Sequence, residues 1–229
     1  MIWNLWADFY DRRLTSANKA ARRNQLNRSI VKFSRAEKNQ LRRIIAKARQ
    51  LTTACPRLNR TPIKILGVRE ELENGYPHTH ADTIFLPHPK FFNQPETEQL
   101  SILIHEWIHL YQRKFSIPFH KYLMEIRNLR ILGLTSEHPQ HERIRQNPDL
   151  NDLIYMNTSD GTYVLPILHQ NASHLNEYDL RAYDARNLLK NTDASPHPEN
   201  EHPFEWVAYD LTRSILSKTV DVDMAATYF

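Results

Sequence analysis

The chain has 229 residues, of which 41% are hydrophobic, so it can bury the core of one globular domain. Its single cysteine, Cys55, excludes an internal disulfide and argues against an oxidised, secreted scaffold. The N-terminus lacks a basic segment followed by an apolar run, and no apolar run has the length of a membrane span, so the expected location is the cytoplasm.

Positive charge is concentrated at the N-terminal end. Residues 1–60 contain 15 Lys and Arg against three acidic residues, a net charge of +12, whereas the rest of the chain carries −8. We expect residues 1–60 to form a basic helical region that packs on, or is appended to, a domain of residues 61–229. A solvated basic face is the favoured interpretation. The alternative is that residues 12–60 contact nucleic acid or an acidic protein partner.

Two helices are predicted in this basic region. A capping box from Ser34 to Glu37 opens the second helix, in which apolar residues recur at helical spacing up to Leu51. The first helix begins with four aromatic residues: Trp3, Trp6, Phe9 and Tyr10.

Two short strands are predicted next, over residues 62–68 and 82–87. Prolines follow the second strand and end it. His78 and His80 lie two residues apart in the expected loop between the strands. Such histidines are usually exposed, and a role as metal ligands is the less favoured interpretation.

An amphipathic helix is expected from Pro95 to Lys114. One apolar stripe recurs at i, i+3, i+4, i+7, i+8 and i+11. His105, Glu106 and His109 lie largely off this stripe, so core packing does not explain them. The stripe consists of Leu100, Leu103, Ile104, Trp107, Ile108 and Tyr111.

His105, Glu106 and His109 form the pattern His-Glu-x-x-His. Residues four apart on a helix differ by about 40° around its axis, so the two imidazoles can bind one ion from the same side. Glu106 lies about 100° further round, where it can hold a water beside the ion without being a ligand. Gln112 returns to the same face and can orient a ligand or substrate, and Arg113 stands in the same relation to Glu106. A surface role is equally compatible with both.

The segment resembles the active-site helix of the zincin superfamily of zinc metallopeptidases. The metzincin branch requires a third histidine six residues after the second, with a glycine between, and Phe115 and Gln112 do not match this. The resemblance is therefore to the gluzincin branch, in which a downstream glutamate completes the site. It implies an α+β, predominantly helical fold with a small sheet bordering the active-site helix. It also implies that the strand before that helix, placed at residues 80–86, pairs with extended substrate.

Downstream of this helix, a second amphipathic helix with a glycine stop is predicted over residues 119–133. Residues 153–156 and 162–166 flank Asp160-Gly161, which predicts a β-hairpin.

The third zinc ligand has two candidate segments, residues 178–184 and 204–210, which both read acid-x-x-Ala-Tyr-Asp. Each is expected to place a carboxylate in the first turn of a helix. Glu205 is preferred, because Pro203 provides a clean helix start and because glutamate matches the gluzincin pattern. Alternatively, each acid only complements the positive end of a helix. The remaining candidates are Glu177, Asp179, His120, His169 and His174.

These assignments predict a peptide-bond hydrolase with one Zn²⁺ held by His105, His109 and Glu205. Glu106 is expected to act as general base. Tyr209, which shares a helix face with Glu205, is the first choice as donor to the oxyanion, ahead of Tyr183 and His174. The alternative function is that of a catalytically idle protein that keeps the fold and binds a partner through its basic arm.

Overall fold

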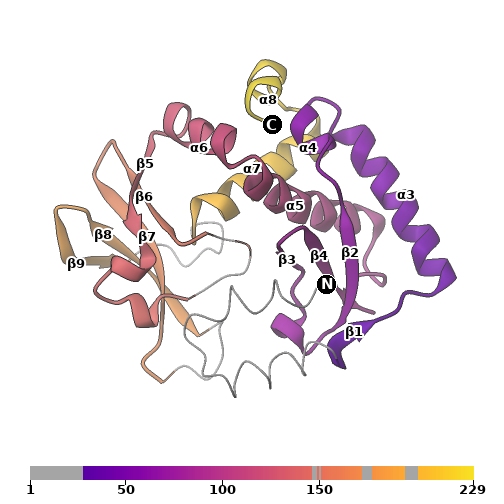
Figure 1. Cartoon of the computed structure of the whole chain (residues 1–229), viewed down its shortest axis with the longest axis horizontal. Coiled ribbons are helices and arrows are strands. Elements are labelled where there is room, and N and C mark those ends of the chain that lie inside the picture. The colour runs from indigo at the N-terminus through magenta and orange to yellow at the C-terminus, as the bar shows by residue number, and fades with distance from the viewer. Residues whose placement is uncertain (1–27, 146–148, 150, 172–176, 194–200) are drawn as a thin grey trace. The chain divides into compact units, whose positions relative to one another are not determined.

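The fold is mixed α and β, with helices and short strands following one another along the chain (Figure 1). The computed structural model describes residues 28–145, 149, 151–171, 177–193 and 201–229. The helix predicted to begin at Trp3 lies outside these residues. The chain forms two units, one of residues 1–114 with 212–227 and 229, the other of residues 115–211 with 228. A boundary at residue 60 stays a prediction.

The first unit contains a four-stranded sheet with the order β1-β2-β4-β3. The two predicted strands are confirmed as β2 and β4, which pair in parallel from Lys64↔Thr83 to Arg69↔His88. β1 and β3 are antiparallel to their neighbours. The bounds are Ile30–Val31 for β1, Lys64–Arg69 for β2, His78–His80 for β3 and Thr83–His88 for β4.

The expectation that residues 80–86 offer a free strand edge to substrate is wrong for most of that segment. Residues Thr83, Ile84 and Phe85 pair with β2 on one side and with β3 on the other. The segment with His78 and His80, expected to be a loop, is the strand β3 and occupies that edge. Both histidines are buried, and the ring of His78 stacks on Phe85 with centroids 5.1 Å apart.

Helices α3 (Arg35–Leu51), α4 (Pro56–Asn59) and α5 (Glu96–Lys114) complete the main part of this unit. The predicted capping box of α3 is present, with Ser34 and Glu37 each bonded to the other's backbone N–H. All six residues of the predicted α5 stripe are buried. Trp107, fully buried, donates its indole N–H to the carbonyl of Thr61 at 3.0 Å and lies under the guanidinium of Arg49.

The second unit begins with α6 (Ser116–Glu125) and continues in strands. Its elements are β5 (Leu129–Leu134), β6 (Leu153–Asn157), β7 (Thr162–Leu168), β8 (Tyr178–Asp184) and β9 (Asn187–Asp193), with short 3₁₀ helices at Thr135–Glu137 and His141–Arg143. β5 pairs with β6, and β7, β8 and β9 form a second antiparallel sheet.

Three sequence expectations in this unit are wrong. The helix predicted over residues 119–133 ends at Glu125, since Asn128 adopts a left-handed conformation with φ of 54° and turns the chain into β5. The turn at Gly161 forms, but β6 pairs with β5 and β7 with β8, so the flanking strands do not form a hairpin ladder. Residues 178–184 form the strand β8 rather than a helix start.

Helices α7 (Pro203–Ser217) and α8 (Val222–Tyr228) end the chain. The predicted start of α7 at Pro203 is confirmed, and the ring of His202 accepts a hydrogen bond from the backbone N–H of Phe204. The division between the two units falls within α7, between Leu211 and Thr212. In the described part of the chain, no helix is both long and apolar enough to cross a membrane.

Glu37 joins the start of α3 to β4. Its carboxylate accepts from the backbone N–H of Ser34 at 2.7 Å and lies 2.7 Å from Nε2 of His88. The hydrogen bond from the Ser34 backbone is the main cause that lowers the pKa of Glu37 below its usual value of 4.5. A carboxylate with a lowered pKa stabilises the fold above its unfolded pKa and loses this effect as pH falls.

We expect Ser34→Ala to lower the free energy of unfolding by about 1 kcal/mol, since it removes the cap of α3.

Glu37→Gln should be less stable than the wild type above pH 4.5, and the difference should disappear as pH falls through the lowered pKa of Glu37. Urea unfolding at a series of pH values measures both effects. Glu70→Gln, at an exposed position, is the matched control, and an equal loss in that variant would refute the role of Glu37.

Candidate metal centre

The second face of α5 is buried as well as its apolar stripe. His109 and Gln112 are fully buried, and Glu106 is 5% exposed. His105 is half-buried. The pattern His-Glu-x-x-His therefore does not belong to a solvated helix face. Polar groups in such a position need partners, because burying them without hydrogen bonds is costly.

The two histidines of the pattern face one another. Nε2 of His109 lies 3.1 Å from Nε2 of His105, and the ring centroids are 4.8 Å apart. Zinc binds imidazole nitrogen at about 2.0–2.1 Å in tetrahedral sites, so two such ligands stand about 3.3 Å apart. The observed separation of the two nitrogens is close to that value. The pair is thus arranged as two ligands of one ion would be.

Gln112 determines which nitrogen of His109 faces His105. Nδ1 of His109 lies 2.8 Å from Oε1 of Gln112, one turn along the helix. An amide oxygen only accepts, so Nδ1 of His109 is the donor and Nε2 carries the lone pair. A metal-binding histidine commonly has its other nitrogen held in this way. The orienting role predicted for Gln112 agrees with this geometry.

Glu205 lies in the first turn of α7 and is 7% exposed. The predicted apolar stripe of α7 is buried. It consists of Phe204, Val207, Ala208, Leu211 and Ile215. His105, His109 and Glu205 each offer one ligand atom, and these atoms all lie within 4.8 Å of one another. Among the described residues, this is the group of His, Cys, Asp and Glu side chains whose spacing suits a metal ion.

An ion pair in the second unit, between Arg145 and the buried Glu201, was not expected from the sequence. Glu201 has a side chain only 4% exposed, and the Arg145 guanidinium also lies 4.8 Å from the ring centre of Tyr178. Burial opposes the charge of Arg145, but the neighbouring carboxylates of Glu201 and Glu205 raise the pKa of its guanidinium. Arg145 is therefore a positive charge near the candidate ligand Glu205. No local sequence pattern connects residues 56 positions apart.

The alternative ligands have other surroundings. Asp179 projects from β8 and is bonded to His169 at 3.1 Å, a contact that lowers the pKa of its carboxyl group. His120 contacts the hydroxyl of Tyr155 at 2.8 Å, and burial lowers the pKa of its ring. Glu177 is half-buried. His174 lies outside the described residues.

Tyr209, Tyr183 and Arg113 were the other residues predicted to act near the metal. Tyr209, the preferred oxyanion donor, is 37% exposed. The hydroxyl of Tyr183 donates to Gln140 at 2.7 Å, which already uses its proton. Arg113 donates to the carbonyl of Ala81 at 3.2 Å and to the hydroxyl of Thr79, so it holds the turn between β3 and β4.

Comparisons of the chain with protein-family models, with curated proteins and with solved structures find no match.

Proposed function

We propose that the protein is a zinc-dependent metallopeptidase that resembles the gluzincin branch of the zincin superfamily. The observation that carries this proposal is the grouping of His105, His109 and Glu205, whose ligand atoms lie within 4.8 Å of one another. Two imidazoles and one carboxylate are the ligand types of catalytic zinc sites that keep one position for water or substrate. The substrate is a peptide or a protein.

The chemistry divides between the ion and Glu106. Zinc, when bound, supplies a Lewis acid that lowers the pKa of water and polarises a carbonyl group. Glu106 follows His105 directly on α5 and is 5% exposed, so its carboxylate is held within the protein rather than in bulk water. Glu106 takes a proton from the attacking water and passes it to the leaving amine, which becomes the new amino terminus.

Tyr209 is the proposed donor to the oxyanion that forms at the substrate carbonyl. It follows Glu205 by four residues on α7 and therefore shares a face with it. The residue as a whole is 37% exposed, so its side chain is accessible from solvent. A phenol O–H that donates to the developing negative charge stabilises it more than the neutral carbonyl of the ground state.

Several cations of the basic helix α3 have partners within the chain: Arg43 and Lys47 pair with Glu96, and Arg49 donates to the carbonyl of Asn59. The side chains of Arg43 and Lys47 are nevertheless 65% and 50% exposed. A nucleic-acid surface requires several cations free to neutralise phosphates. Docking through residues 12–60 stays a prediction.

Replacing the proposed third ligand should remove zinc selectively. We expect purified wild-type protein to hold about one zinc ion per chain and Glu205→Ala to bind zinc more than about 100-fold more weakly. Asp179→Ala is the control, since Asp179 is an exposed partner of His169. Elemental analysis and competition with a chelator measure the affinity. Equal zinc binding by both variants would exclude Glu205 as a ligand.

Replacing the proposed base should separate zinc binding from hydrolysis. Glu106→Gln keeps the shape of the side chain but cannot take a proton, so we expect unchanged zinc content and hydrolysis lower by about 10²–10⁴-fold. A screen of unstructured peptides, read by mass spectrometry of the fragments, provides the assay. Wild-type rates in the variant would show that Glu106 is not the base.

Removing the amide that orients His109 should weaken zinc without removing a ligand. We expect Gln112→Ala to lower zinc affinity by about 10–100-fold. Gln112→Glu restores an acceptor for Nδ1 of His109 and should recover most of the affinity. If both variants bind zinc as the wild type does, the hydrogen bond between Gln112 and His109 does not contribute to the site.

A further inference from the structure

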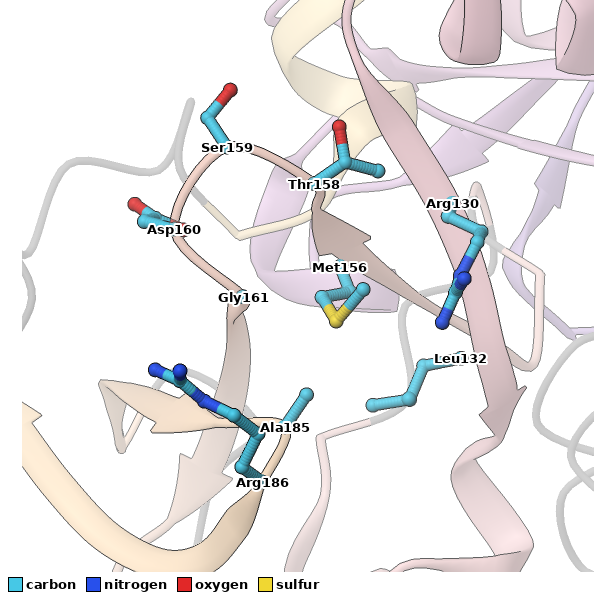
Figure 2. A pocket seen from close by; sticks show the side chains of 9 residues that line it. All are labelled: Arg130, Leu132, Met156, Thr158, Ser159, Asp160, Gly161, Ala185 and Arg186. Atoms are coloured by element: carbon cyan, nitrogen blue, oxygen red, sulfur yellow. The ribbon is translucent and has the colours of Figure 1, made fainter.

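A pocket of about 410 Å³ lies within the second unit, away from the proposed zinc ligands in sequence (Figure 2). Its walls come from β5, from the end of β6 with the turn that follows, and from the turn between β8 and β9. The lining residues are Arg130, Leu132, Met156, Thr158, Ser159, Asp160, Gly161, Ala185 and Arg186. This volume is in the range of pockets that hold small molecules.

The inner side of the pocket is apolar. Met156 and Ala185 pack against the buried core cluster of this unit, and Leu132 adds an aliphatic side chain that is 36% exposed. The cluster beneath them consists of Ile144, Ile154, Tyr163, Leu165, Ile167 and Tyr183. The inner wall therefore rests on packed core rather than on a loose loop. An apolar group placed there would be removed from water against a firm surface.

Arg130 carries a positive charge at the wall of the pocket. Its side chain makes no hydrogen bond or ion pair with the residues that the structure describes, while its backbone is paired with Met156 in the β5–β6 ladder. Figure 2 shows its side chain extending toward Leu132 and Met156. Arg186, by contrast, is paired with Asp184 through Nε at 3.1 Å and Nη2 at 3.3 Å. Arg130 is thus the guanidinium available to a ligand.

The negative charge at the rim is already satisfied. Asp160 accepts from the hydroxyl of Thr162 at 2.7 Å and from its backbone N–H at 2.9 Å, which together lower the pKa of the carboxyl group. A phosphate dianion would meet this carboxylate and only one unpaired guanidinium. A single carboxylate is the better match for Arg130, because the guanidinium can donate two parallel hydrogen bonds to it.

We propose that this pocket binds an apolar group that carries a carboxylate, with the carboxylate on Arg130 and the apolar group against Leu132, Met156 and Ala185. The same chemistry is offered by a small organic acid and by the chain end of a peptide with an apolar last residue. The proposal is independent of the zinc site, because no proposed zinc ligand lines the pocket.

The test uses the full-length protein and ligand-observed NMR titration with N-acetyl-leucine. We expect N-acetyl-leucine to bind saturably. Its neutral amide should bind at least about tenfold more weakly, because a charge-assisted hydrogen bond is lost. Arg130→Gln should lower the affinity for N-acetyl-leucine by about tenfold or more, whereas Arg130→Lys should retain part of this affinity. Arg186→Gln should have a smaller effect, since its charge is already paired.

Arg42→Gln, which removes an exposed arginine from α3, is the matched control and should bind as the wild type does. A pentapeptide ending in leucine distinguishes the two kinds of ligand. Tighter binding of the pentapeptide than of N-acetyl-leucine would indicate that the pocket binds the end of a peptide. Equal or weaker binding would indicate that it binds a small organic acid. The proposal is overturned if the acid does not bind saturably, if acid and amide bind equally, or if Arg130→Gln binds as the wild type does while circular dichroism shows it folded.

Discussion

The burial of α5 on more than one face is the constraint on which the candidate site depends. An amphipathic helix with an exposed polar side would leave its histidines free to rotate in water. Here His109 and Gln112 are fully buried, so each needs a hydrogen-bonding partner, and each finds the other. The ring of His109 is therefore oriented by the protein itself, with Nε2 toward His105. Because the ring is already oriented, less side-chain conformational entropy is lost when an ion binds.

The charge around Glu205 is organised by a residue far away in sequence. Arg145 is half-buried and pairs with the buried Glu201, and it also interacts electrostatically with Glu205. A buried guanidinium is costly unless carboxylates compensate it. In the proposed centre, Glu205 would be attracted both by a divalent ion and by the positive charge of Arg145. The arrangement places three ionisable groups in one network rather than leaving an isolated ligand.

The pocket in the second unit arises from local geometry rather than from the proposed zinc site. Small residues, Gly161 and Ala185, stand at two of its walls, and Gly161 has a φ of 75° with no atom within 4 Å of where a Cβ would lie. The guanidinium of Arg130, whose side chain has no partner among the described residues, lines this pocket together with the apolar side chains of Leu132 and Met156. None of the three proposed zinc ligands lines the pocket.

Local patterns determined much of what could be predicted. The helix α5, the capping box of α3, the start of α7 at Pro203 and the strands β2 and β4 follow from periodicity and from residues with strong end preferences. The spacing of His105 and His109 also predicted that their nitrogens would meet, because helix geometry alone brings residues four apart to one side.

Tertiary structure decided the features that depend on partners distant in sequence. Residues 178–184 are compatible with a helix by spacing, but pairing with β7 makes them a strand, since seven residues are too few for periodicity to choose. β6 pairs with β5 rather than with β7 because residues 129–134, which resembled a helix, became its ladder partner. The Arg145–Glu201 pair and the environment of Arg130 had no sequence signal. Each depends on which side chains the fold brings together, and that is a property of packing rather than of local sequence.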